Sequence, residues 1–229
     1  MAWLVQLLGP QDALERLPTL VQGEPYAVVR FENGIYLRGS ALDGLPDATG
    51  ARAKAGEVCR YLESVLQVFV VLVDELRPGN VLAADSGGTP RARNLFAFKN
   101  FRVISERGLK GLAATDPNGS TLASNILRLA DRDPRVAQAF YIVGNRDIGW
   151  HEIYDLIDLM GGVNALVKRG WAKRKELNRL RQTANHHRHR GSRRTKDALP
   201  ENPPTLSEGA NAVRVLLQQW LTERLSKAH

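Results

Sequence analysis

The stretch from Lys168 to Lys196 contains the side chains of this sequence that are best suited to chemistry on an anion. It holds twelve of the 32 Lys and Arg residues, one of the 24 acidic residues and three of the five His residues. Its net charge is therefore +11, whereas the remainder of the chain carries −3. Because so many like charges repel one another, we expect a solvated face that attracts anions, and phosphate is their usual counter-charge.

This charge distribution predicts a protein that binds nucleic acid, with RNA favoured over DNA, through the segment 168–196. For Trp150 and Trp171 core packing is the expected role, and only Trp171 is placed beside cations where it could stack on a base. The competing hypothesis is an interaction module that docks an acidic partner protein. The phosphate contacts are predicted from Lys168, Lys173, Arg174, Arg179, Arg181, Arg188 and Arg190.

Spacing within the same stretch also suits acid–base catalysis on RNA. Arg181 and His186 are separated by four residues, so a helix could bring both side chains towards one phosphodiester. The Arg would neutralise the phosphate, and a His that titrates near neutrality could act as general acid or base without a metal. The amide of Asn185 could orient the base or the imidazole. The catalytic candidates, ranked below plain binding, are Arg181, Asn185, His186, Arg188 and His189.

The Arg-x4-His spacing inside a helical region resembles the HEPN domains. These are small helical bundles of bacterial toxin and defence systems, whose RNases carry an Arg-x4-to-6-His motif that is usually completed by dimerisation. The resemblance covers about residues 121–225 and implies a metal-independent endoribonuclease that acts as a homodimer. HEPN motifs favour Asn, Asp or His directly after the Arg, whereas Gln182 follows Arg181 here.

The chain also resembles a group of uncharacterised bacterial proteins. The similarity lies in the Phe-Glu-Asn-Gly-Ile-Tyr-Leu-Arg-Gly segment of the N-terminal half, in a Trp-containing helix, and in a Thr-Ala-Asn followed by Arg-His. This group implies no function. It directs attention to four positions for testing, which are Trp150, Asn185, Arg188 and His189.

Two further groups of residues could bind a cation. Glu152, Asp155 and Asp158 are three residues apart, so they could face the basic helix or hold a cation with His151. We favour an ordinary solvated face, because no Asp-x-Asp or His-x3-His spacing supports a metal site. The three His residues of the basic stretch could bind Zn²⁺, but the cations around them repel a dication. We therefore expect no metal and no cofactor.

The elements that position these residues follow from hydrophobic periodicity. The strongest local pattern is a hairpin, in which the runs 26–31 and 35–38 flank Asn33-Gly34, a pair that suits a type I′ turn. A helix with one buried stripe is predicted from Ala51 to about Leu72. Further strands are predicted at 2–8, 81–84 and 94–104, the last two as a pair, with one or two helical turns at 10–17.

After residue 121 the pattern becomes entirely helical. The predicted fold is therefore α+β, with a small antiparallel sheet and a long helix in an N-terminal domain and an all-helical bundle in a C-terminal, strongly basic domain. We expect these domains to span 1–115 and 121–229, joined by the loop 116–120. The helices are predicted at 121–131, 134–143, 148–160, 163–169, 173–185 and 207–225.

The composition is typical of a globular protein from a reducing compartment. Its 43% apolar content permits a substantial core, and the single cysteine, Cys59, excludes an intramolecular disulfide. The apolar run at the N-terminus stops at Gly9-Pro10 and lacks a basic flank, so no signal peptide is expected. The longest apolar run, Val65–Val73, is about half the length that a membrane span needs. We therefore expect a cytoplasmic protein that does not enter membranes.

Overall fold

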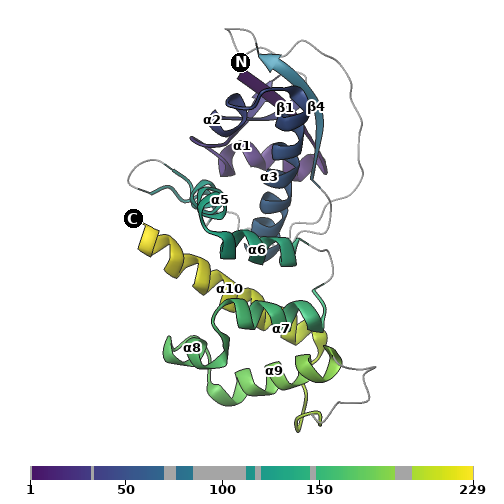
Figure 1. Ribbon diagram of the computed structural model, residues 1–229, viewed down its shortest axis with the longest axis vertical. Coiled ribbons are helices and arrows are strands. Elements are labelled where there is room, and N and C mark those ends of the chain that lie inside the picture. The colour runs from purple at the N-terminus through teal and green to yellow at the C-terminus, as the bar shows by residue number, and fades with distance from the viewer. Residues whose placement is uncertain are drawn as a thin grey trace. The chain divides into compact units, whose positions relative to one another are not determined.

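The computed structural model describes residues 2–31, 34–69, 76–84, 112–116, 120–144, 148–188 and 198–228 (Figure 1). These residues belong to two compact units, Met1–Pro134 and Arg135–His229. The first unit combines an antiparallel sheet with helices, and the described part of the second unit is helical. The predicted α+β class with a helical C-terminal half is thereby confirmed.

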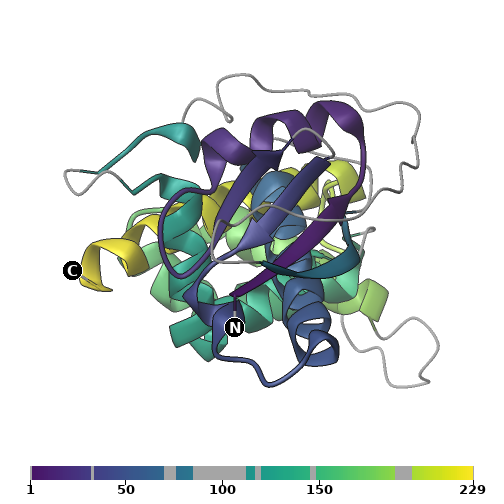
Figure 2. The same cartoon turned by 90° about the horizontal axis from the view of Figure 1, so that it is seen from above.

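A four-stranded antiparallel sheet forms the centre of the first unit, in the order β2-β3-β1-β4. Because Trp3 to Leu7 of β1 are all buried, both faces of this inner strand are covered. Figures 1 and 2 show α1 beside β2 and β3, and α3 beside β1 and β4. The strands are Ala2–Leu8 (β1), Ala27–Phe31 (β2), Gly34–Arg38 (β3) and Arg77–Ala84 (β4); the helices are Gln11–Leu20 (α1), Ser40–Asp43 (α2), Ala48–Phe69 (α3) and Leu122–Arg132 (α5).

The predicted hairpin is present as β2 and β3, but the connection between its strands is centred one residue before Asn33-Gly34. Phe31 pairs with Gly34, so Gly34 belongs to β3, and the two connecting residues lie outside the described part of the chain. This register sets Val28 opposite Leu37, and both side chains are buried. Relative to a turn centred on Asn33-Gly34 the pairing is shifted by two residues, so each side chain keeps its face of the sheet and only its partner on the other strand changes.

Within the described residues, β4 has a partner that the sequence did not predict. β4 pairs antiparallel with β1, with Trp3 opposite Ala83 and Val5 opposite Val81. The run 94–104, which was predicted to pair with 81–84, lies outside the described residues. The described edge of the sheet is therefore built from segments far apart in sequence.

The helix α5 belongs to the first unit, so the division at Pro134 lies after the predicted boundary at 116–120. Thr121 caps α5 by accepting a hydrogen bond from Ser124 N at 3.1 Å, and Ser124 Oγ donates to Gln22 O at 2.8 Å. These bonds fasten the start of α5 to the segment that follows α1.

An ionic network joins α3 to the other end of α5. Lys54 Nζ lies 2.9 Å from Asp131 Oδ1 and 3.0 Å from Glu57 Oε2, and Tyr61 Oη donates to Glu57 Oε1 at 2.7 Å. Burial works against the charge of Glu57, but the hydrogen bonds from Tyr61 and Lys54 outweigh it and lower the pKa of the carboxyl. Burial and the bond to Glu57 raise the pKa of Tyr61 to about 12.

In the second unit, three helices pack around α7. The helix α7 contacts α8, α9 and α10, and its buried residues Ile153, Leu156 and Ile157 form the centre of the core. Gly209 lets α10 approach closely, because a Cβ there would lie 3.0 Å from Trp150 Cζ3. The helices are Pro134–Val143 (α6), Trp150–Leu159 (α7), Gly162–Lys168 (α8), Arg174–Arg188 (α9) and Leu206–Ala228 (α10).

Candidate nucleic-acid interface

The basic helix α9 is positioned by a narrow apolar stripe. Leu177, Leu180 and Ala184 are buried at helical spacing, and Thr183 between them donates to the Arg179 carbonyl at 2.9 Å. Glu176 lies in the first turn and Arg188 in the last, an arrangement that the helix dipole favours. Packing on this single stripe leaves most of the helix surface to polar residues.

The exposed cations of this region lie on the N-terminal half of α9 and the segment before it. Lys175 and Arg179 are four residues apart, which places them one above the other on the helix surface. Arg174 donates to Asn164 Oδ1 at 2.8 Å and is also exposed. Lys175 is absent from the predicted contacts, although its spacing from Arg179 could have identified it. The exposed cations are Lys168, Arg169, Lys173, Arg174, Lys175 and Arg179, and of these Arg169 is ion-paired with Glu223.

Arg181 and Arg188, by contrast, turn towards α7, and both guanidinium groups contact the ring of one tyrosine. Their guanidinium carbons lie 5.0 Å and 4.7 Å from the ring centre of Tyr154. Arg181 Nη2 donates to Tyr154 Oη at 2.9 Å and lies 3.4 Å from Asp158 Oδ1. Arg188 Nη1 lies 3.6 Å from Asp155 Oδ1. Acids of the chain therefore compensate both cations.

The favoured interpretation of the acids on α7 as a solvated face holds for Asp155 and Asp158, whose side chains are 49% and 44% exposed. The same two residues also form ion pairs with arginines of the basic helix. Glu152 has a different role, because its Oε2 accepts a hydrogen bond from Gly149 N at 3.0 Å and caps α7. Across the described ranges, no three His, Cys, Asp or Glu residues gather as a metal site would require.

The histidines at the end of α9 lie among aromatic rings. His187 stacks on Trp150 with ring centres 5.1 Å apart and planes 9° apart, and His186 meets His187 edge to face at 5.4 Å. Asn185, His186 and His187 are all half-buried. Trp150 is thus a half-buried platform for His187 rather than a fully buried core residue.

The side chains of the predicted catalytic pair, Arg181 and His186, leave α9 in different directions. Arg181 and His186 are five positions apart on α9, so their directions differ by about 140° at 3.6 residues per turn. Arg181 and Arg188, seven positions apart, share a face instead. The other two predicted site residues, His189 and Arg190, lie outside the described residues.

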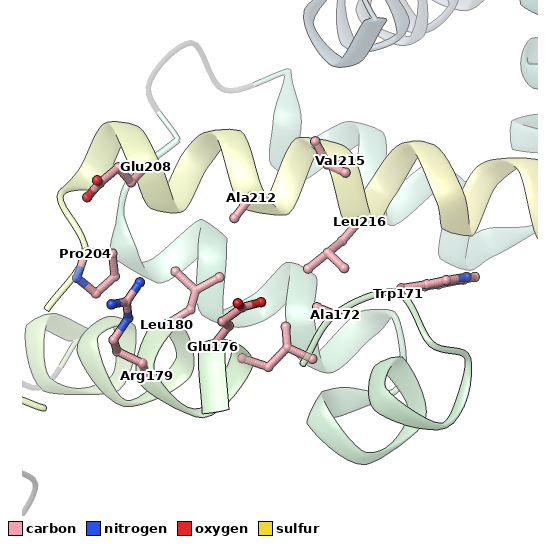
Figure 3. Close-up of a pocket in the computed structure, with 11 residues that line it drawn as sticks. Trp171, Ala172, Glu176, Arg179, Leu180, Pro204, Glu208, Ala212, Val215 and Leu216 are labelled. Atoms are coloured by element: carbon pink, nitrogen blue, oxygen red, sulfur yellow. The ribbon is translucent and has the colours of Figure 1, made fainter. Parts of the chain in front are cut away.

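An apolar groove lies between α9 and α10, and one of the exposed cations, Arg179, lines it (Figure 3). It has a volume of about 330 Å³. Trp171 stands at one end and Arg179, with Pro204 and Glu208, at the other. The floor and walls are apolar and come from Ala172, Leu177, Leu180, Ala212, Val215 and Leu216.

Trp171 forms part of this groove and is half-buried, which corrects the expectation that it packs in the core. The guanidinium of Arg169 lies 5.1 Å from the centre of its ring. Arg169 is held in turn by Glu223 of α10, with Nε 2.7 Å from Oε2. Sequence reasoning missed the groove, because its second wall comes from a helix some 35 residues further along the chain.

Comparison of the chain with protein-family models, curated proteins and solved structures gives no significant match. Among the residues described here, no helix combines the length and the apolar character that crossing a membrane requires.

Proposed function

We propose that the second unit binds nucleic acid, and RNA in particular, through the exposed cations of α9 and the segment before it. The observation that carries this proposal is the separation of two kinds of cation on one helix. Arg181 and Arg188 are compensated by acids of α7, whereas Lys173, Lys175 and Arg179 are exposed. Clustered exposed cations of this kind attract the phosphate backbone and release its counterions.

The test is a polarisation titration of the full chain with labelled RNA at several salt concentrations. The variant Lys173→Gln/Lys175→Gln/Arg179→Gln is expected to bind more weakly and to lower the slope of log K against log salt by about 2, at about 0.7 per lost contact with a single strand. The matched control, Arg16→Gln/Arg38→Gln/Arg52→Gln, removes three exposed cations of the first unit. Equal losses in the two variants, or a wild-type chain that does not bind at low salt, would refute the proposal.

An acidic partner protein is the alternative ligand for the same cations. Pull-down from a lysate with and without nuclease separates the two ligands. If RNA is the ligand, nuclease removes the captured material, whereas an acidic protein partner stays bound.

RNA cleavage is a second candidate, favoured by the half-buried His186–His187 pair directly beside Arg188. Since Arg181 and His186 diverge on one helix, one phosphodiester could meet both only across two copies of the chain, the dimer that the HEPN resemblance implies. Incubation with total RNA in EDTA tests this candidate as a further arm of the binding experiment. Cleavage that is lost in His186→Ala or His189→Ala but kept in Arg193→Ala would support it, and intact RNA throughout would reject it.

A further inference from the structure

We propose that the groove between α9 and α10 receives an unpaired base of single-stranded RNA, with Trp171 as the stacking surface. The inference rests on the proposed RNA binding by α9 and adds the structural class of the ligand. A basic helix alone would not distinguish a duplex from a single strand, because both present phosphates. The groove adds an aromatic stacking surface and apolar contacts, which a base requires.

The dimensions of the groove suit a small planar group. Its volume of about 330 Å³ is at the lower end of the roughly 300–1,000 Å³ typical of ligand pockets. A base with its ribose is an occupant of this size, whereas a paired base inside a duplex cannot leave its stack without breaking pairing. Filling the groove therefore selects unpaired nucleotides.

The lining offers both stacking and apolar contact. Every base has a π face, so a half-buried indole beside a cationic helix is a sequence-tolerant binding surface. The ring of Trp171 is held in advance by Arg169, which Glu223 fixes with an ion pair of 2.7 Å. Leu177, Leu180 and Leu216 supply apolar contact beside it.

Charges around the groove are arranged for a nucleotide. Arg179 lines it and Lys175 lies one turn before, so phosphates on the strand can meet cations while a base points inwards. Two carboxylates line the groove, Glu176 between its two ends and Glu208 at one end, and both can accept hydrogen bonds from N–H groups of a base. Thr205 N and Thr205 Oγ1 both donate to Oε2 of Glu208, at 2.7 Å and 2.9 Å. These two hydrogen bonds do not involve Oε1 of the same carboxylate.

The same two carboxylates argue against an acidic peptide as the occupant. A peptide rich in Asp or Glu would bring like charges to Glu176 and Glu208 and would offer the apolar floor nothing in return. An unpaired base carries N–H donors and no charge. The groove and the cations together therefore favour a single nucleic-acid strand.

The experiment compares the affinity of the full chain for three labelled ligands of equal length: a single RNA strand, the same strand annealed to its complement, and an abasic ribose-phosphate strand. We expect the wild type to prefer the single strand with bases. Trp171→Leu should weaken that complex about tenfold and leave duplex binding unchanged, since stacking on an aromatic ring is worth roughly 1–3 kcal/mol per base.

A second variant keeps the inference testable if Trp171→Leu fails to fold, as judged by circular dichroism. Ala212→Tyr fills the groove from an exposed position of α10, and should weaken single-strand binding as Trp171→Leu does. Its matched control, Ser207→Tyr, adds the same side chain at an exposed position of α10 that does not line the groove, and should change nothing.

The outcomes separate the two proposals. Equal wild-type affinity for all three ligands, or single-strand affinity that neither groove variant changes, overturns the base-binding inference and leaves RNA binding by α9 intact. A wild-type chain that binds none of the three ligands overturns the proposed function itself.

Discussion

At the residue scale, the two arginines that face α7 differ from the exposed cations in being compensated within the chain. Arg181 and Arg188 share the ring of Tyr154, and each is paired with one aspartate, Asp158 and Asp155 respectively. Such partly exposed pairs contribute little to stability. Their larger effect is on the electrostatic field that a phosphate meets at α9.

Removing the two carboxylates should therefore strengthen RNA binding. Asp155→Asn/Asp158→Asn keeps the shape of both side chains but frees both arginines for phosphate. We expect a several-fold gain in affinity at low salt and a slope steeper by about 0.7 for each new contact with a single strand. Polarisation titrations over a range of salt concentrations measure both quantities.

The control for this double variant is Asp12→Asn/Asp47→Asn, which makes the same charge change at exposed positions of the first unit. If the control gains as much affinity, the effect comes from net charge alone. An unchanged affinity in the α7 variant would show that Arg181 and Arg188 do not reach the ligand.

Glu57 makes a pH-dependent contribution to the stability of the first unit. The pKa of its carboxyl is lowered, because hydrogen bonds from Tyr61 and Lys54 outweigh the effect of burial. A lowered folded pKa means that the contribution is present above the unfolded value of about 4.3 and disappears as the pH falls through the folded value. The thermal unfolding midpoint of Glu57→Gln should therefore be lower than that of the wild type at pH 7, and the difference between the two midpoints should shrink below about pH 4. A difference that stays constant from pH 7 to pH 3 would contradict this assignment.

At the element scale, hydrophobic periodicity in the sequence located most helices and strands. Contacts between segments far apart in the sequence set the pairing and register of the strands. β1 spans the predicted positions 2–8, and the buried positions of α3 include the predicted stripe at Ala55, Val58 and Leu62. The hairpin was found, but its register was not, because Val28 and Leu37 pair in the core and local turn preference carries no information on that pairing.

The site shows the same limit. Charge counting located the cations of α9, since a run of basic residues is visible without any structure. It could not tell Arg179 from Arg181, because that distinction depends on which side of α9 meets the acids of α7. The groove at Trp171 depends on α10 in the same way. What the sequence predicted was therefore a basic helix, and what it could not predict was which cations remain exposed.

At the scale of the whole molecule, the two units differ sharply in charge. Residues 135–229 hold 17 of the 32 basic residues and nine of the 24 acidic ones, a net charge of +8. The first unit holds 15 of each sign and is neutral. Long-range attraction of a polyanion is therefore expected to act on the second unit alone.

This asymmetry predicts where RNA will protect the chain from hydrogen exchange. A ligand that binds only the native form suppresses local opening around its site by mass action. With saturating single-stranded RNA, amide exchange followed by mass spectrometry should slow in peptides that cover α8, α9 and the first half of α10. Peptides from β1, β2 and β3 should exchange as they do without RNA. The same measurement with the Lys173→Gln/Lys175→Gln/Arg179→Gln chain should show little protection anywhere. Protection centred on the sheet would place the RNA on the neutral unit and would contradict an electrostatic interface on α9.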